Sequence, residues 1–287
     1  MPNFDYEAPT SLKTALGFLS GNGEIRPLAG GTDVIDQLKS NRRNADLVVD
    51  LKRVPELLAL ELDQGHLRIG AAVSCTEVHN LTSENDCFPA LSEASELIGS
   101  IHIQNRASIG GNVCNAAPSA DTIPPLLVHE AVAHTTSATG ERQIPVIDFF
   151  AGPGQTVLQK GELLKELVLP VSSSNAASAY LRFIPRNEMD IAVAAAGASV
   201  ILNKSGDQFL SARVALASVG PIPIMVEDLD VDGKPVDDDT IQSIAEAARM
   251  SAKPISDMRG TIEQRLHLVE VLTRRALQGA IQRARGV

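Results

Sequence analysis

The sequence is poor in aromatic residues, which make up 3% of its 287 residues and include no tryptophan. The hydrophobic core must therefore depend on Val, Leu, Ile and Ala, which favours a layered α/β or α+β structure. A chain of this length forms two domains or one large domain. Its 44% hydrophobic and 21% charged residues are typical of a globular protein.

Cysteine is also scarce, because Cys75, Cys87 and Cys114 are the three in the chain. They form no Cys-x-x-Cys pair and show no His/Cys spacing typical of zinc, so no metal site is predicted. Three thiolates are too few to hold an iron–sulfur cluster through four of them. Isolated cysteines are typical of a reducing compartment. We therefore expect a cytoplasmic protein, either free or peripheral to the inner membrane face.

Long apolar runs and excess positive charge are missing as well. No run approaches the ~20 residues that span a bilayer, and Met1–Tyr6 lacks the basic and apolar regions of a signal peptide. The formal net charge of -10 argues against a protein that binds the phosphate backbone of nucleic acid. Seven acidic residues between 227 and 239 are interpreted as a solvated loop rather than a metal site.

Two loops with adjacent glycines are the most informative feature that is present. The first is Pro27–Asp33, and the second is Ala107–Asn112, which continues to Asp121. Glycine tolerates positive φ and lets backbone come close to a ligand. Successive N–H groups in such turns form concave anion sites, which are suited to a pyrophosphate. The two loops together therefore suggest one dinucleotide held from two sides.

Each loop taken alone is also compatible with an ordinary turn. Neither loop matches the dinucleotide fingerprint with three spaced glycines or the P-loop with its Lys-Ser/Thr ending. A Rossmann or P-loop fold is therefore disfavoured.

The hydrophobic pattern places the first loop in a βαβ-like unit. A strand at 25–29 leads into the loop, a helix follows, and the apolar run 47–51 is typical of a buried strand. A strand pair at 58–62 and 66–69 is predicted around a turn at 63–65. The polar segment Ser172–Asn175 is the candidate domain boundary. Beyond it, the pattern predicts three antiparallel strands (179–184, 192–202 and 213–219) and two helices, the last from 261 to 285.

With both loops, their order and the C-terminal segment in view, the chain resembles the FAD-binding medium subunit of molybdenum hydroxylases. That family includes carbon monoxide dehydrogenase, nicotine dehydrogenase and the flavin portion of xanthine dehydrogenase. The resemblance covers essentially the whole chain. It is carried by four motifs: Pro-Leu-Ala-Gly-Gly-Thr-Asp, Ala-Ser-Ile-Gly-Gly-Asn with Pro-Ser-Ala-Asp, Glu-Leu-Leu before a strand ending in Pro, and Arg-x-x-x-Asp-Ile-Ala.

The resemblance implies an α+β fold with two domains. Residues 1–174 would form a two-subdomain FAD-binding domain of the vanillyl-alcohol-oxidase (PCMH) type, with subdomains at about 1–55 and 56–174. Residues 175–287 would form a C-terminal α+β domain of the carbon monoxide dehydrogenase flavoprotein type, with a three-stranded antiparallel sheet.

The resemblance also implies an electron-transfer function. FAD on this chain would take electrons from [2Fe-2S] clusters on a small iron–sulfur subunit and pass them to an external acceptor. A large molybdopterin subunit would feed the clusters, and the assembly would be a dimer of heterotrimers. No nucleic-acid partner and no integral membrane segment are expected. A self-contained FAD oxidase or dehydrogenase of the same fold is the alternative, and a non-enzymatic ligand-binding protein is a third class.

The implied cofactor contacts fall into three groups. The first wraps the pyrophosphate and ribityl chain: Leu28, Ala29, Gly30, Gly31, Thr32, Asp33 and Val34. The second lines the other side of the cofactor and the adenine region: Ala107, Ser108, Gly110, Gly111, Asn112, Cys114, Ala120, Ile98 and Gly99. The third contains Asp121 as acceptor for an FAD hydroxyl, Leu164, Arg182 near the flavin ring where the family often has Lys, and Asp190.

Three of these residues have a structural alternative. Asp121 also suits the cap of a helix that starts at Thr122. Asp190 also suits an ion pair with Arg186, four residues earlier, and Cys114 also suits a small buried filler. No Ser/His/Asp or Cys/His set is recognisable, so no catalytic residue is predicted.

Overall fold

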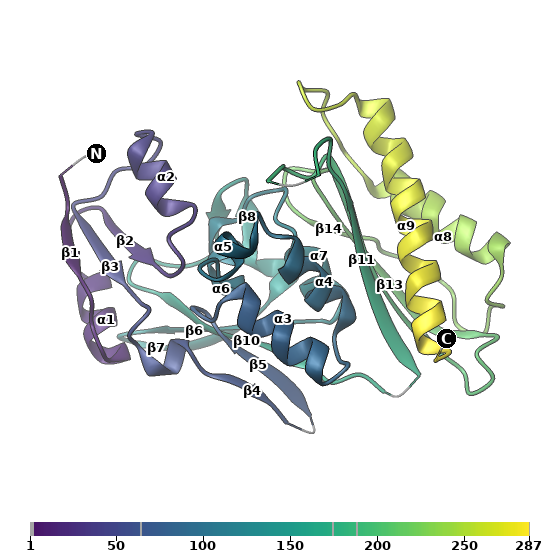
Figure 1. Cartoon of the computed structure of the whole chain (residues 1–287), viewed down its shortest axis with the longest axis horizontal. Helices are drawn as coiled ribbons and strands as arrows, with labels where there is room; N and C mark the ends of the chain where they lie inside the picture. Colours follow the sequence, from purple (N-terminus) through teal and green to yellow (C-terminus); the bar gives the residue numbers. More distant parts are fainter. Residues whose placement is uncertain (1–2, 64, 174, 188, 287) are drawn as a thin grey trace.

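The computed structural model describes residues 3–63, 65–173, 175–187 and 189–286. The chain begins with a small parallel sheet in the order β1-β3-β2 (Figure 1). Its strands are Asp5–Glu7 (β1), Ile25–Leu28 (β2) and Leu47–Asp50 (β3), and its helices are Leu12–Leu19 (α1) and Val34–Lys39 (α2). β2, α2 and β3 form the predicted βαβ unit.

A five-stranded antiparallel sheet in the order β4-β5-β10-β6-β7 follows. Its strands are Leu60–Leu62 (β4), His66–Gly70 (β5), Val132–Ser137 (β6), Gly140–Pro145 (β7) and Leu163–Pro170 (β10). The helices of this part are Cys75–Glu84 (α3), Pro89–Leu97 (α4), Ile101–Gln104 (α5), Ile109–Asn115 (α6) and Ile123–Val128 (α7). Short connecting elements are the 3-10 turns Pro55–Leu57 and Val146–Phe149 and the strand pair Phe150–Gly152 (β8) and Gln155–Thr156 (β9). Side chains from β5, α3, α6, α7 and β10 share one hydrophobic core.

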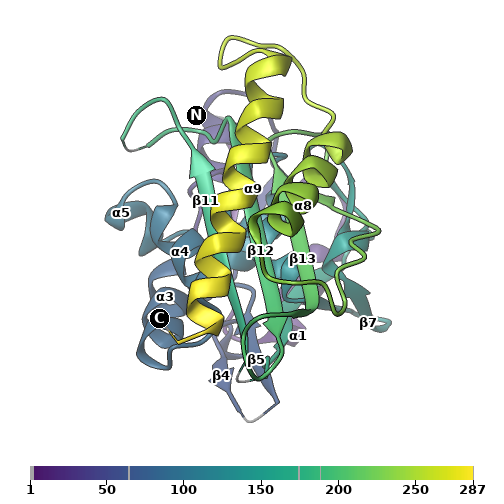
Figure 2. The same ribbon diagram turned by 90° about the vertical axis from the view of Figure 1, so that its right-hand side faces the viewer.

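The C-terminal part is a four-stranded antiparallel sheet with two helices on one face (Figure 2). The strands are Ala176–Phe183 (β11), Ala194–Leu202 (β12), Phe209–Ala217 (β13) and Ile224–Met225 (β14), and the helices are Asp238–Ser251 (α8) and Ile262–Ala284 (α9). Three long strands and a last helix match the sequence prediction. The two-residue β14 was missed because so short a strand has no period to detect.

Small side chains in β12 allow the C-terminal sheet to be covered on both faces. Alternate residues point to opposite faces of a strand. Ala194, Ala196 and Ala198 therefore face the core shared with α8 and α9. On the other face, Ala195 packs with α4 residues, and a Cβ added at Gly197 would lie 3.1 Å from Pro124 in α7. Figure 1 shows α4 and α7 between the five-stranded sheet and the C-terminal sheet.

The antiparallel pairing of β4 with β5 confirms the predicted hairpin. The predicted turn and domain boundary include Gln64 and Ser174, which lie outside the described residues, as do Met1, Pro2 and Val287. The boundary therefore stays a prediction. In the part of the chain that is described, no helix combines the length and apolarity needed to cross a membrane.

We expect Gly197→Val to destabilise the protein, because the added carbons meet Pro124 across the sheet–helix contact. Overpacking of this kind costs about 1–3 kcal/mol. Gly17→Ala is the control, since a Cβ on this α1 residue has no neighbour within 4 Å. Thermal unfolding should show a lower midpoint for Gly197→Val and no loss for Gly17→Ala. An unchanged midpoint for Gly197→Val would contradict the tight packing.

Candidate functional site

The two glycine loops lie in direct backbone contact. A Cβ built on Gly30 would lie 2.0 Å from the carbonyl oxygen of Arg106 and 2.8 Å from the Cα of Ala107, so a side chain does not fit there. On the other side of the contact, a Cβ on Gly111 would lie 4.0 Å from the Cβ of Ala29. Segments that are distant in sequence thus form one surface, as the sequence analysis predicted.

Side-chain hydrogen bonds fix the second loop to the helix that follows it and join the helices that follow the two loops. Ser108 is buried, and its hydroxyl accepts from the N–H of Gly111 at 3.0 Å, which caps α6. Gln37 in α2 donates to Asn115 in α6 at 2.9 Å, so the two helices are joined.

The buried Gly110 allows close packing, because a Cβ there would lie 2.5 Å from the carbonyl oxygen of Ala71. Gly110 therefore serves the packing of α6 rather than an open loop surface.

The first loop offers unpaired backbone donors. In the described part of the chain, the N–H groups of Gly30, Gly31 and Thr32 donate to no backbone carbonyl. Gly31 has φ of +79°, a conformation that favours glycine. Half-buried N–H groups need acceptors, and consecutive ones form an anion-binding concavity. This geometry fits a pyrophosphate.

The remaining loop residues support this surface. Asp33 is exposed at the start of α2 and makes no side-chain capping bond. The others are buried or half-buried nonpolar side chains: Leu28, Ala29, Val34, Ala107 and Ala120.

A second group of contacts brings Asp121 and Arg182 together. The Arg182 guanidinium donates from Nη1 to Asp121 Oδ2 at 2.5 Å and from Nη2 to the carbonyl oxygen of Leu97 at 2.7 Å. The Tyr180 hydroxyl donates to Asp121 Oδ1 at 2.6 Å. The Asp121 and Arg182 side chains are 12% and 6% exposed. Burial raises the pKa of Asp121, against the opposing effects of the Arg182 charge and the hydrogen bonds from Tyr180 and Arg182.

The alternative role of Asp121 as a helix cap is wrong. Helix α7 starts after Thr122, which makes no capping bond, and the Asp121 carboxylate is directed to β11 instead. Sequence reasoning did not include Tyr180. The available signal was its position two residues before Arg182 on a predicted strand, which places both side chains on the same face.

Further contacts connect this group to the loops. Thr122, next to Asp121, donates to Asn112 Oδ1 in α6 at 2.7 Å. The carbonyl that Arg182 contacts belongs to Leu97, so Ile98 and Gly99 follow directly, and Gly99 has φ of +53°. Contacts of neighbouring residues thus link the two loops, Ile98–Gly99, Asp121 and Arg182 in one region of the molecule.

Leu164 and Cys114 lie at the core side of this region. Leu164 in β10 is 1% exposed and belongs to the core that includes α6. Burial raises the pKa of the Cys114 thiol to about 12, so it stays protonated at neutral pH. Its side chain is half-buried and packs against this core, as a filler does, and its contact with the cofactor stays a prediction.

Asp190 has partners in the C-terminal part instead. Its carboxylate lies 3.3 Å from Arg186, which confirms the i, i+4 pair, and 3.3 Å from Arg259. Backbone and arginine hydrogen bonds lower the pKa of Asp190, with the N–H of Ile191 contributing most. Its contact with a cofactor stays a prediction that these bonds do not support.

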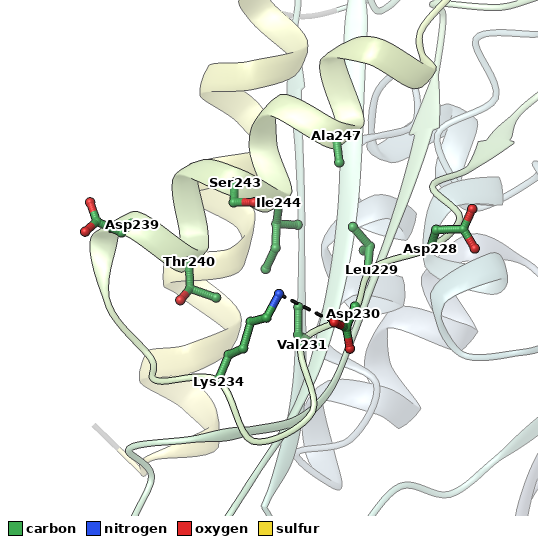
Figure 3. A pocket seen from close by; sticks show the side chains of 10 residues that line it. All are labelled: Asp228, Leu229, Asp230, Val231, Lys234, Asp239, Thr240, Ser243, Ile244 and Ala247. Atoms are coloured by element: carbon green, nitrogen blue, oxygen red, sulfur yellow. Dashed lines mark ion pairs between the residues drawn. The ribbon is translucent and has the colours of Figure 1, made fainter.

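A cavity of about 340 Å³ lies away from this site, between α8 and the acidic loop before it (Figure 3). None of the predicted site residues lines it. One basic side chain, that of Lys234, lines the cavity and lies 3.8 Å from Asp230. The other charged side chains in the lining, Asp228, Asp230 and Asp239, are acidic. This charge does not suit a dinucleotide phosphate.

Comparisons with known proteins agree with the site. Residues 2–172 match the family described as the FAD binding domain in molybdopterin dehydrogenase, and residues 179–280 match the CO dehydrogenase flavoprotein C-terminal domain. The chain belongs to the FAD-binding medium subunits of molybdenum hydroxylases. This confirms the resemblance and the α+β two-domain architecture, and it makes FAD the cofactor of this chain.

Individual relatives share nearly the full length. The putative xanthine dehydrogenase FAD-binding subunit XdhB of Escherichia coli is 31% identical over 285 residues, covering 98% of this chain and 97% of that protein. The glyceraldehyde dehydrogenase medium chain of Sulfolobus acidocaldarius is 32% identical and covers 96% and 98%. Carbon monoxide dehydrogenase from Hydrogenophaga pseudoflava, solved without the Mo-pyranopterin moiety of its molybdenum cofactor, contains a chain with a TM-score of 0.92 and 27% identity, covering 97% of each.

We expect Gly31→Val to abolish FAD binding, because a branched side chain is placed beside the free N–H groups. The substitution also forces Val into a left-handed conformation, which costs about 1–2 kcal/mol. Gly233→Val is the matched control: it has φ of +74° and no neighbour within 4 Å of an added Cβ. Both variants should lose similar stability, and the flavin-to-protein absorbance ratio should fall for Gly31→Val alone. Full flavin in a folded Gly31→Val protein would refute the pyrophosphate assignment.

Proposed function

We propose that this chain is the electron-transfer subunit of a heteromeric molybdenum hydroxylase. It takes electrons from [2Fe-2S] clusters on a small iron–sulfur subunit, which a large molybdopterin subunit supplies, and passes them to an external acceptor. The observation that carries the proposal is the contact between the two glycine loops, linked by the Thr122–Asn112 hydrogen bond to Asp121 and Arg182. The full-length match to relatives named as FAD-binding subunits and medium chains of dehydrogenases supports it.

Different residues of the proposed site hold different parts of the cofactor. The free N–H groups of Gly30, Gly31 and Thr32 bind the pyrophosphate, since they are the unpaired donors of the first loop. Asp121 still has lone pairs that can accept a cofactor hydroxyl after its bonds to Tyr180 and Arg182. Arg182 places a permanent positive charge at the site. Bound FAD supplies two-electron uptake and one-electron release, which suits a junction between clusters and an acceptor.

The small number of cysteines in this chain favours a subunit over a self-contained oxidase. Its three cysteines are free, and three are too few for a four-thiolate cluster. Free thiols also support the proposal of a cytoplasmic location. The substrate and the molybdenum chemistry therefore belong to the partners, in a dimer of heterotrimers.

The surface next to Arg182 is suited to a protein partner. Leu97 and Ile101 are 36% and 56% exposed. Leu97 accepts the Arg182 hydrogen bond, and Ile101 begins α5 directly after the Ile98–Gly99 segment, so these apolar residues lie next to the site. Exposed apolar side chains that cluster mark interaction surfaces. We place the iron–sulfur subunit here.

Co-expression with the small and large chains should give one co-purifying assembly. Substrate should bleach the flavin absorbance in that assembly and leave the isolated subunit oxidised, because no catalytic residue is predicted on this chain. Flavin reduction by substrate in the purified single chain would instead support the self-contained oxidase.

Ile101→Asp should reduce co-purification of the iron–sulfur subunit by about tenfold, since a charge is desolvated in an apolar contact; one such tenfold step is 1.4 kcal/mol. Met250→Asp is the control, because Met250 is also exposed (85%) but lies in α8. Both variants should keep FAD. Unchanged assembly for Ile101→Asp would move the docking surface elsewhere.

A further inference from the structure

Strand β11 of the C-terminal part is fixed along helix α4 by three hydrogen bonds. The Ser178 hydroxyl accepts from the N–H of Ala90 at 3.1 Å. The N–H of Tyr180 donates to Glu93 Oε2 at 2.7 Å, and Arg182 reaches the carbonyl of Leu97. The strand residues follow a period of two, and their α4 partners at 90, 93 and 97 follow a helical period. This register places Tyr180 and Arg182 beside Asp121.

Tyr180 is buried among closely packed side chains. It is 1% exposed and packs in a cluster of small residues from α4 and the C-terminal sheet: Ala90, Ala94, Ala192, Ala195 and Ala217. Its ring has little freedom, so the hydroxyl has a fixed position. Burial raises the pKa of Tyr180 well above its ordinary value, and the Asp121 charge adds to this effect. The hydroxyl is therefore protonated and always available as a donor to Asp121.

The Arg182 guanidinium has a buried donor, at Nε, without a partner among the described residues. Nη1 is bonded to Asp121 and Nη2 to Leu97, which fixes the plane of the group. Its Nε atom is buried and has no hydrogen-bond partner in the described part of the chain. A buried donor without an acceptor costs about 1–3 kcal/mol. The Arg182 cation is therefore held at a cost, by contacts that fix its position rather than by contacts that satisfy all of its donors.

We propose that Tyr180 is a positioning residue of the FAD site, whose hydroxyl fixes Asp121 so that Asp121 and Leu97 hold the Arg182 cation in one place. This inference rests on the proposed function and deepens it. A cation fixed beside the flavin stabilises the negative charge of its reduced form. Without the hydroxyl, the Asp121 carboxylate and the Arg182 cation lose their fixed position. The reduced form is then stabilised less, and the reduction potential becomes more negative.

Tyr180→Phe tests this on the purified FAD-loaded subunit. We expect it to keep FAD, while binding of reduced flavin weakens about tenfold more than binding of oxidised flavin, which is a shift of about 30 mV to more negative potential. Arg182→Gln should shift the potential in the same direction. The double variant should add nothing to Arg182→Gln, because Tyr180 acts through Arg182. Equilibration with a reference dye measures the potential, and FAD titration gives the same comparison where loading is incomplete.

Tyr6→Phe is the matched control. Tyr6 is the other tyrosine of the chain, and its hydroxyl also donates to a carboxylate, that of Asp50 at the end of β3. The control should leave the potential unchanged, and its thermal midpoint shows what loss of such a bond does to stability alone. A wild-type potential in FAD-loaded Tyr180→Phe would overturn the proposal. So would a shift that adds to that of Arg182→Gln, or loss of FAD from Tyr180→Phe when Arg182→Gln retains it. None of these results depends on partner subunits, so electron transfer within the assembly is tested separately by co-expression.

Discussion

The contact of Gly30 with the backbone of Arg106 and Ala107 is the constraint on which the site depends. With 2.0 Å between a hypothetical Cβ and a carbonyl oxygen, any side chain separates the two loops. The contact fixes the first loop on the second, and the Gln37–Asn115 bond keeps the following helices together. The loop donors are therefore held in place before a ligand arrives, which lowers the cost of ordering them on binding.

The C-terminal part contacts the FAD-binding domain at Asp121, one of the predicted site residues. Its sheet reaches α4 and α7 because Ala195 and Gly197 leave room for the helices. That close approach brings β11 onto α4, and β11 then carries Tyr180 and Arg182 to Asp121. The packing of small residues between the two parts therefore also sets the position of the Arg182 charge at the proposed cofactor site.

The Asp121–Arg182 pair is better explained by function than by stability. Removing water from two charges costs several kcal/mol for each, about as much as their attraction returns, so a buried pair is weak evidence for stability. Breaking such a pair by removing one partner costs about 3–5 kcal/mol, because a charge remains buried. The pair is nearly buried and leaves Arg182 Nε without a partner. An arrangement that also leaves a donor unsatisfied is typical of a ligand site.

Local elements could be predicted from the sequence, and the role of the glycine loops was predicted from the same short-range signals. The apolar run at 47–51 and the glycines at 30 and 31 predicted β3, the βαβ unit and a pyrophosphate loop, since these depend on side-chain period and backbone freedom within a few residues. The pairing of Arg186 with Asp190 was also predictable from their spacing. The motifs identified the family because they occur in a fixed order over the whole chain.

Which residues these elements contact depends on the tertiary structure. That Asp121 bonds to Tyr180 and Arg182 rather than capping α7 depends on the docking of β11 on α4, between residues about sixty positions apart. Similarly, Gly30 and Gly110 were predicted as equivalent loop glycines, and packing separated them, because Gly30 meets the second loop and Gly110 meets Ala71. Local spacing contains no information on such contacts, since hydrogen bonds and close approaches between distant segments are set by how whole elements pack.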